Sequence, residues 1–268
     1  MASASGRTSV RGFAVNELAN NAEVMPAPAP LPAAPAARPR ASLVLEACGL
    51  LLLPAVMVAS VAFGIDQGGA AGIITSVVSL LLFFLSYEWG RPALRETMPV
   101  VVMAALAAAG RIIFTPIPSV QPMTALVIMA GCLFGRRSGF MVGALGGLVS
   151  ALFVGMGAWA PWQMYSWGLI GWIAGVAGGR GVFSRPWVVY GYGFAAGLLY
   201  GLVMNIWSMV SFYHPETFAQ MLVIWAPAIP FDVTHGVSTM VFLALLWAPW
   251  RRKLERLKLQ YGLGDAAE

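Results

Sequence analysis

The chain has 268 residues, of which 59% are hydrophobic and only 10% are charged, and its mean hydropathy is +0.77. A soluble domain carries about 25% charged residues, so the composition excludes a soluble enzyme and a soluble nucleic-acid-binding domain. Lysine and arginine outnumber aspartate and glutamate by 16 to 11, and we interpret this surplus as a signal of membrane topology. The sequence predicts an all-α integral membrane protein.

The N-terminal 40 residues contain no apolar run, and Met25–Arg40 is rich in proline and alanine. This composition is typical of an extended, disordered tail. Eight apolar runs follow, and a membrane helix needs roughly 20 such residues; the fourth and sixth runs are short. The runs are Leu43–Phe63, Ala70–Tyr87, Met98–Phe114, Met123–Phe134, Phe140–Met156, Gln163–Gly178, Trp187–Val210 and Ala228–Ala248.

Two further segments near the C-terminus have a different pattern. Pro215–Trp225 is apolar but precedes Pro227 and Pro230, so we expect a separate helix near the outer surface. Arg251–Leu263 mixes basic and apolar residues at helical spacing, which is typical of a helix on the inner membrane face.

The positions of the basic residues test the count of eight spans. If the N-terminal tail is cytoplasmic, the outer loops are 64–69, 115–122, 157–162 and 211–227, and they contain no lysine or arginine. The inner loops and the C-terminus contain Arg91, Arg95, Arg136, Arg137, Arg180, Arg185, Arg251, Arg252 and Lys253. This segregation follows the positive-inside rule, so we predict eight spans with both termini inside the cell.

Polar and ionisable side chains within membrane spans are costly and therefore mark candidate functional sites. Most of them fall toward the outer side, namely Arg111, Gln121, Gln163, Asn205, Asp232 and His235. The inner half contains only Glu46 and groups at loop edges. This asymmetry predicts a pocket that opens outward, without a polar path through the whole membrane.

Arg111 is the only basic residue that we place on the outer side. In hydrocarbon it requires an anion, and Asp232 is the obvious intramembrane candidate, so we predict an Arg111–Asp232 pair. The alternative is that both side chains extend to the interface and never meet. His235 lies on the same helix face as Asp232, and it is either a core histidine or a ligand contact.

Aromatic residues are concentrated at the same end of the spans, and the run at 157–163 places Trp159 and Trp162 around a proline. One interpretation is an aromatic belt at the membrane interface. The other is a rigid wall or lid over a bulky, flat ligand. For Trp207 and Trp225 we favour the belt.

The third span contains two small-residue stripes, Ala104 with Ala108 and Ala105 with Ala109. Such a stripe allows another helix to approach closely. Packing within the bundle and contact with a partner protein are both compatible with it.

The sequence contains no GxxxxGK[ST] phosphate loop, no HExxH and no GxSxG motif. Its two cysteines have no metal-binding spacing. We therefore expect neither ATP hydrolysis by this chain nor a metal or cofactor, and we do not expect an enzyme.

Several ordered motifs resemble the substrate-binding S components of energy-coupling factor (ECF) transporters, most closely the branch associated with cobalamin uptake. The motifs are Gly110–Pro122, the glycines Gly131, Gly135, Gly139 and Gly143, the run Gly157–Gly168 and the ending Asp232–Gly262. The sequence departs from this branch at Ala151, Met156, Ala158 and Ala160, where the branch has Asn, Gln, Pro and Thr. Three polar side chains are thus lost near the expected pocket, and such losses change which ligand is preferred.

The resemblance covers about residues 98–262 and implies a six-helix bundle at 98–250 that captures a vitamin on the outer side. The tail at 1–40 and a two-span extension at 41–97 precede this bundle, and a basic cytoplasmic tail at 251–268 follows it. The resemblance also implies docking to a transmembrane T component with two ABC-type ATPase subunits in the cell membrane. Ala104 and Ala108 lie on the helix that carries the family's Ala-xxx-Ala contact motif for the T component.

The substrate implied by the resemblance is cobalamin or a related corrinoid. Another micronutrient, such as a queuosine precursor, is the alternative within transport; an intramembrane enzyme acting on a lipid and a structural membrane protein are alternatives of other classes. Family ligand sites lie among outer loops and outer helix ends, where the polar and aromatic residues described above also gather. We therefore expect as substrate-binding residues Arg111, Gln121, Trp159, Trp162, Gln163, Asn205, Asp232 and His235.

Overall fold

The computed structural model describes residues 39–63 and 68–261. Within these ranges the regular secondary structure is entirely helical. The predicted disordered tail, except for its last two residues, lies outside the described residues, as do residues 262–268.

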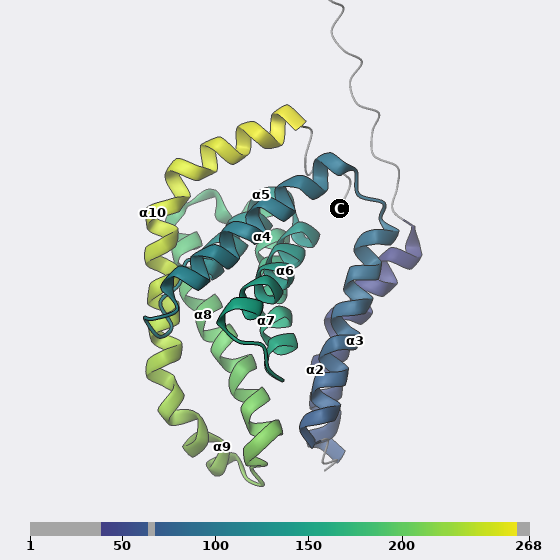
Figure 1. The fold of residues 1–268 in the computed structure, drawn as a ribbon, viewed down its shortest axis with the longest axis vertical. Helices are drawn as coiled ribbons and strands as arrows, with labels where there is room; N and C mark the ends of the chain where they lie inside the picture. Colours follow the sequence, from purple (N-terminus) through teal and green to yellow (C-terminus); the bar gives the residue numbers. More distant parts are fainter. Residues whose placement is uncertain (1–38, 64–67, 262–268) are drawn as a thin grey trace, which may run out of the picture. The chain divides into compact units, whose positions relative to one another are not determined.

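The eight long helices correspond one to one with the eight predicted apolar runs (Figure 1). They are α2 (Arg40–Phe63), α3 (Gly68–Trp89), α4 (Leu94–Phe114), α5 (Met123–Phe134), α6 (Arg136–Val154), α7 (Ala160–Gly179), α8 (Pro186–Ser208) and α10 (Ile229–Tyr261). The shorter elements are η1 (Val182–Ser184), η2 (Met209–Tyr213), α9 (Phe218–Trp225) and η3 (Ala226–Ala228). α9 is the predicted separate helix before the last span, and a capping box between Thr217 and Gln220 fixes its start.

Among the described residues, six helical segments are long and apolar enough to cross a membrane, and α5 and α7 are not among them. These two correspond to the runs that the sequence marked as short. Eleven of the 12 residues of α5 are buried, and α7 packs against α5, α6 and α8. Neither helix therefore needs the long apolar surface that contact with lipid requires.

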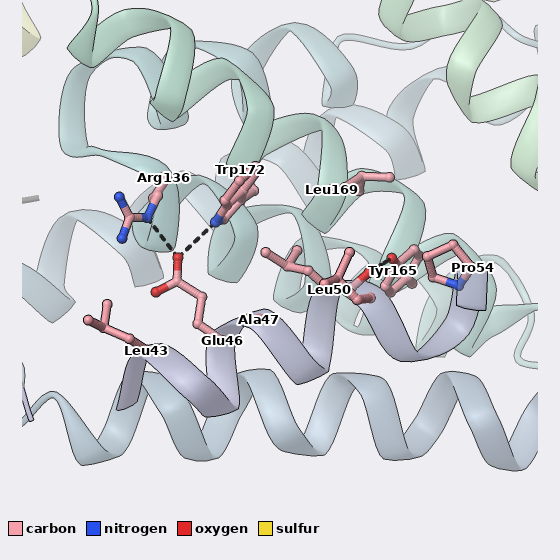
Figure 2. Close-up of a pocket in the computed structure, with 10 residues that line it drawn as sticks. Leu43, Glu46, Ala47, Leu50, Pro54, Arg136, Tyr165, Leu169 and Trp172 are labelled. Atoms are coloured by element: carbon pink, nitrogen blue, oxygen red, sulfur yellow. Dashed lines mark hydrogen bonds and ion pairs between the residues drawn. The ribbon is translucent and has the colours of Figure 1, made fainter. Parts of the chain in front are cut away.

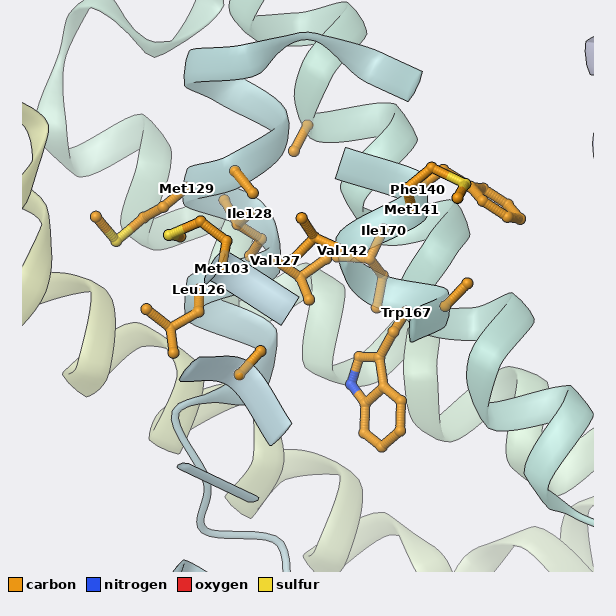
Figure 3. Packing of buried hydrophobic residues seen from close by; sticks show 14 of the residues in the cluster. Met103, Leu126, Val127, Ile128, Met129, Phe140, Met141, Val142, Trp167 and Ile170 are labelled. Carbon is orange, nitrogen blue, oxygen red and sulfur yellow. The ribbon is translucent and has the colours of Figure 1, made fainter. Parts of the chain in front are cut away.

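Helices α4 to α8 and α10 pack into one bundle. α4 lies against α5 and α6, and α10 lies against α5 and α8. Figure 3 shows core side chains of α4, α5, α6 and α7 meeting in its interior. Glycine permits the close contact between α6 and α7, because a Cβ atom at Gly139 would overlap the carbonyl of Gly171 and one at Gly143 would overlap the backbone of Trp167.

The α2–α3 hairpin is attached to α6 and α7. Gly49 of α2 lies so close to α3 that a Cβ atom there would be 2.8 Å from the backbone nitrogen of Phe83. The ring of Phe83 stacks on Phe140 of α6, with ring centroids 3.6 Å apart. From α7, the Tyr165 hydroxyl donates a hydrogen bond to the carbonyl of Leu50. The extension is thus packed on the bundle through both of its helices.

An ionic cluster fastens the first turns of α2 to the basic end of the bundle (Figure 2). The buried carboxylate of Glu46 accepts hydrogen bonds from Arg136 Nε (2.7 Å), Arg137 Nε (2.6 Å) and Trp172 Nε1 (2.9 Å). Arg137 also donates to the Ser42 hydroxyl at 2.7 Å. We call these five residues the Glu46 clamp.

A cavity of about 440 Å³ adjoins the Glu46 clamp between α2 and helices α6 and α7 (Figure 2). Apart from Glu46 and Arg136, its lining is mainly apolar, with Leu50, Pro54 and Leu169 among the wall residues. None of the predicted substrate-binding residues lines this cavity. The predicted substrate-binding residues therefore lie in another part of the bundle.

Candidate functional site

A buried polar network lies at the end of the bundle opposite the Glu46 clamp. Arg111, near the end of α4, is only 9% exposed. Its Nη1 donates to the Ser150 hydroxyl of α6 at 2.8 Å, and its Nη2 donates to Gln163 Oε1 of α7 at 2.9 Å. The guanidinium carbon lies 4.8 Å from the ring centre of Trp167, which is the geometry of a cation–π contact.

The network continues through Thr124 to α8 and α10. The indole Nε1 of Trp167 donates to Thr124 Oγ1 at 3.1 Å, and Thr124 Oγ1 lies 2.8 Å from His235 Nε2. The Tyr200 ring stacks on Trp167 and tilts against the His235 ring, in both cases with centroids 4.7 Å apart. We call the seven residues the Arg111 network; they are Arg111, Thr124, Ser150, Gln163, Trp167, Tyr200 and His235.

Helix direction and small residues explain why these side chains meet. α4 and α6 end at this side of the bundle, while α5, α7 and α10 begin there. The last turns of the first two helices and the first turns of the other three therefore supply most of the side chains that meet in the network. Glycines of α6 permit close contact with α7 and with α4. Gly143 and Gly147 lie against α7 near Trp167, and Gly146 lies against Ala104 and Ala107 of α4.

The partners of Arg111 in the part of the chain that the structure describes are electrically neutral. A guanidinium carries five N–H donors, and Ser150 and Gln163 accept one each, which leaves three for other acceptors. In the Glu46 clamp, by contrast, Arg136 and Arg137 share a carboxylate. The Arg111 network is therefore a fixed positive charge at the bundle end, with N–H donors that the described residues do not use.

The predicted Arg111–Asp232 pair is wrong. Asp232 instead accepts hydrogen bonds from Asn205 Nδ2 and Trp225 Nε1, both at 3.0 Å. Its carboxylate lies against Gly201, where any side chain would overlap it. Both charges do lie at the predicted end, but α8 and α9 supply closer partners for Asp232 than α4 does, and the sequence does not reveal which helices are neighbours.

Trp159 and Trp162 lie in different surroundings. Trp159 is 38% exposed, covers Gly157 and meets the Trp207 ring edge to face at 6.2 Å. Trp162 is 1% exposed, and its indole ring lies against Gly72 of α3. Trp162 therefore packs inside the fold, against the N-terminal hairpin, and does not form a wall with Trp159.

Gln121 and His235 also have defined positions. The backbone N–H of Gln121 donates to the Ser238 hydroxyl of α10 at 3.0 Å, which ties the loop after α4 to the last helix. His235 is 3% exposed. Its contacts with Thr124 and Tyr200 make it a buried network residue, which is compatible with both interpretations of this histidine.

The stripe of Ala104 and Ala108 does not lie on the surface. These residues are 4% and 1% exposed, and the carbonyl of Ala104 faces Gly146 of α6. This corrects the expectation that they contact a partner protein, and the packing alternative applies to them. The second stripe, Ala105 and Ala109, occupies the exposed face of α4.

Four members of the network were missed in the sequence, namely Thr124, Ser150, Trp167 and Tyr200. Serine and threonine in membrane helices so often bond to their own backbone that a single hydroxyl carries little signal. Trp167 and Tyr200 were indistinguishable from belt or packing aromatics. Trp167 does lie in the Gly157–Gly168 motif, and this position was the one signal that could have pointed to it.

A family model described as "ECF-type riboflavin transporter, S component" matches residues 95–251. This range is more than half of the chain and contains the whole Arg111 network, while α2 and α3 precede it. Searches among curated proteins and among solved structures gave no match. S components act with a transmembrane T component and ATPase subunits. The chain belongs to the ECF-type riboflavin transporter S component family, and it is a membrane-embedded, substrate-binding subunit of a vitamin transporter.

Proposed function

We propose that this subunit captures its vitamin from outside the cell in a site built around the Arg111 network. The observation that carries the proposal is the polarity of the bundle. Arginines flank the helices at the end of the Glu46 clamp, whereas the loops beside the Arg111 network contain no lysine or arginine. By the positive-inside rule, the Arg111 network faces the outside of the cell membrane.

The leading substrate is cobalamin or a related corrinoid. The support is the resemblance of Gly157–Gly168 and Asp232–Gly262 to the cobalamin-uptake branch. Riboflavin is the second candidate, because the matched family model is described by that vitamin. Both molecules contain a large flat ring system that suits aromatic surroundings, and a queuosine precursor is a further candidate within the same transport class.

In this proposal Arg111 donates hydrogen bonds to the substrate, Gln163 donates or accepts them, and His235 supports the site from within the network. Trp159 covers the bound vitamin from the loop before α7. Asn205 and Asp232 contribute a second polar position near α9, and Gln121 contributes from the loop after α4. The outer loops close over the vitamin, and ATP hydrolysis in two ABC-type partner subunits then drives reorientation of the bundle.

The proposal is tested by isothermal titration of cobalamin and riboflavin into the purified full chain. We expect tight binding of one vitamin by the wild type and loss of that binding in Arg111→Ala and in Trp159→Ala. Trp89→Ala is the matched control, since Trp89 is an exposed tryptophan at the end of α3, away from the network. A folded wild-type protein that binds neither vitamin would contradict both substrate assignments.

The partner assignment has its own test. Ala105 and Ala109 form a small-residue stripe on the exposed face of α4, where a helix of the T component could approach closely. We expect Ala105→Leu to abolish copurification with the T component while vitamin binding persists. Copurification that survives both Ala105→Leu and Ala109→Leu would place the docking face elsewhere.

A further inference from the structure

The described part of the chain contains two arginines whose whole residue is buried, Arg111 and Arg137. Arg137 is neutralised by Glu46 at 2.6 Å. Arg111 has only neutral partners, namely a hydroxyl, an amide oxygen and the face of an indole. Burying an unpaired charge is strongly unfavourable, and within a membrane such a residue is by default a functional one.

Among residues 39–63 and 68–261, no acidic group forms an ion pair with Arg111. Asp232 is the acidic residue at this end of α10, and its carboxylate is held by Asn205 and Trp225. Glu46 belongs to the clamp at the opposite end. Within the described part of the chain the positive charge of Arg111 is thus left unbalanced, which favours an anion that enters the site with the ligand.

The guanidinium of Arg111 is held in a fixed position before any ligand binds. Ser150 and Gln163 hold one N–H group each, and Trp167 supports the planar face. Thr124 in turn fixes the indole of Trp167. The remaining N–H groups form part of a planar fork, and this geometry matches the paired oxygens of phosphate and carboxylate groups.

The network also reaches the surface. Gln163 is only partly buried, and the chain before it, from Gly155 to Trp159, is largely exposed. The Trp159 ring lies nearest to Gly157, and a Cβ atom added at Gly155 would meet only open space. A ligand group can therefore approach Arg111 past the first turn of α7.

We propose that Arg111 binds an anionic oxygen group of the transported substrate and selects substrates that carry one. This inference rests on the proposed vitamin-capture function. In the corrinoid proposed above, the group is the phosphodiester of the nucleotide loop. In the flavin alternative, it is the phosphate of FMN, which riboflavin lacks.

Matched ligand pairs test this selection. Dissociation constants are measured for cobalamin against cobinamide, which lacks the nucleotide loop, and for FMN against riboflavin, with the full chain in lipid nanodiscs. For the pair that binds, we expect the phosphate-bearing member to bind about 10- to 100-fold more tightly to the wild type, as for a charge-assisted hydrogen bond. The ratio falls to about one in Arg111→Gln and is partly retained in Arg111→Lys. Arg95→Gln, an exposed position on the same helix, keeps the wild-type ratio.

A second measurement does not depend on the choice of vitamin. If Arg111 awaits an anion, the ligand-free Arg111→Met protein unfolds at the same temperature as the wild type or at a higher one, because an uncompensated charge has been removed. If Arg111 is structural, the same variant unfolds at a clearly lower temperature, and the inference is overturned.

The two proposals fail in distinguishable ways. An affinity ratio that is unchanged in Arg111→Gln overturns the anion inference while vitamin capture stands. Equal affinity of the wild type for both members of the pair that binds overturns it as well. If none of the four ligands binds to folded wild-type protein, the proposed substrates fail, and the unfolding temperature of Arg111→Met alone decides whether Arg111 is an anion site.

Discussion

The two ends of the bundle contain buried arginines in opposite electrostatic situations. At the basic end, Arg136 and Arg137 converge on the carboxylate of Glu46, and Arg137 also bonds to Ser42. At the other end, Arg111 is held by neutral groups only. The first cluster joins the N-terminal hairpin to the bundle, whereas the second joins nothing outside the bundle.

The difference separates a structural use of buried charge from a binding use. A buried ion pair with satisfied hydrogen bonds is self-contained, and removing one partner leaves an isolated charge. A buried cation without an anion is destabilising until a ligand supplies one. Replacing a buried charged residue should therefore lower stability at the Glu46 clamp but not at Arg111.

The largest effect is expected for Glu46→Gln. The substitution leaves Arg136 and Arg137 without their carboxylate, and breaking a buried pair in this way costs about 3–5 kcal/mol of stability. Thermal unfolding in detergent measures it, with Glu88→Gln at an exposed position of α3 as control. An unfolding temperature equal to that of the wild type would show that the clamp does not stabilise the fold.

A carboxylate placed beside Arg111 should neutralise this arginine, as Glu46 neutralises Arg136 and Arg137 at the basic end. In Ser150→Asp the new side chain replaces the hydroxyl that lies 2.8 Å from Arg111 Nη1. We expect unchanged or higher stability together with a loss of vitamin affinity of about 100-fold, because the protein's own anion now occupies the guanidinium. Ser150→Asn, which is similar in shape and neutral, is the control. Equal affinities of the two variants would contradict the contrast.

Thr124→Val tests how far the network depends on one hydroxyl. The change removes the acceptor of Trp167 Nε1 and the partner of His235, and leaving buried polar groups unsatisfied costs about 1–3 kcal/mol. We expect lower stability and weaker vitamin binding, measured by thermal unfolding and titration. Thr234→Val, at an exposed position of α10, should change neither quantity. A stable variant with normal binding would mean that Trp167 is fixed by packing alone.

The smallest effect is expected for Trp172→Phe at the basic end. Glu46 loses one neutral donor but keeps both guanidinium groups, so the stability should fall by about 0.5–1.5 kcal/mol. Chemical denaturation resolves such a difference, and vitamin binding should not change. A loss as large as that of Glu46→Gln would mean that the indole, and not the ion pair, holds α2 in place.

The helices could be predicted well from the sequence because membrane helices consist of long apolar runs. Each of the eight predicted runs is a helix, and even the separate α9 was anticipated from the prolines around it. The short runs at α5 and α7 proved to be the helices that lie inside the bundle. α5 has 12 residues, 11 of them buried, whereas α7 extends over 20 residues, 11 of them buried.

The candidate site was predicted only in part. Arg111, Gln163 and His235 were predicted to lie near one another, and the structure joins them in one network. The predicted partner of Arg111, Asp232, was wrong. Trp162 packs on α3, and Ala104 and Ala108 are buried, with Ala104 against α6. Each of these errors concerns which helix lies next to which, and hydropathy does not contain that information.

The sequence by itself therefore determined the membrane class, the helices and the end of the bundle at which polar groups gather, because length, hydropathy and the positions of arginine are local properties of the chain. Only the tertiary structure decided that Glu46 neutralises Arg136 and Arg137, while Arg111 meets no carboxylate among the described residues. The physical reason is that a buried charge is balanced by whatever the neighbouring helices present within about 3 Å. Which helices are neighbours is settled by close packing at residues such as Gly139 and Gly143.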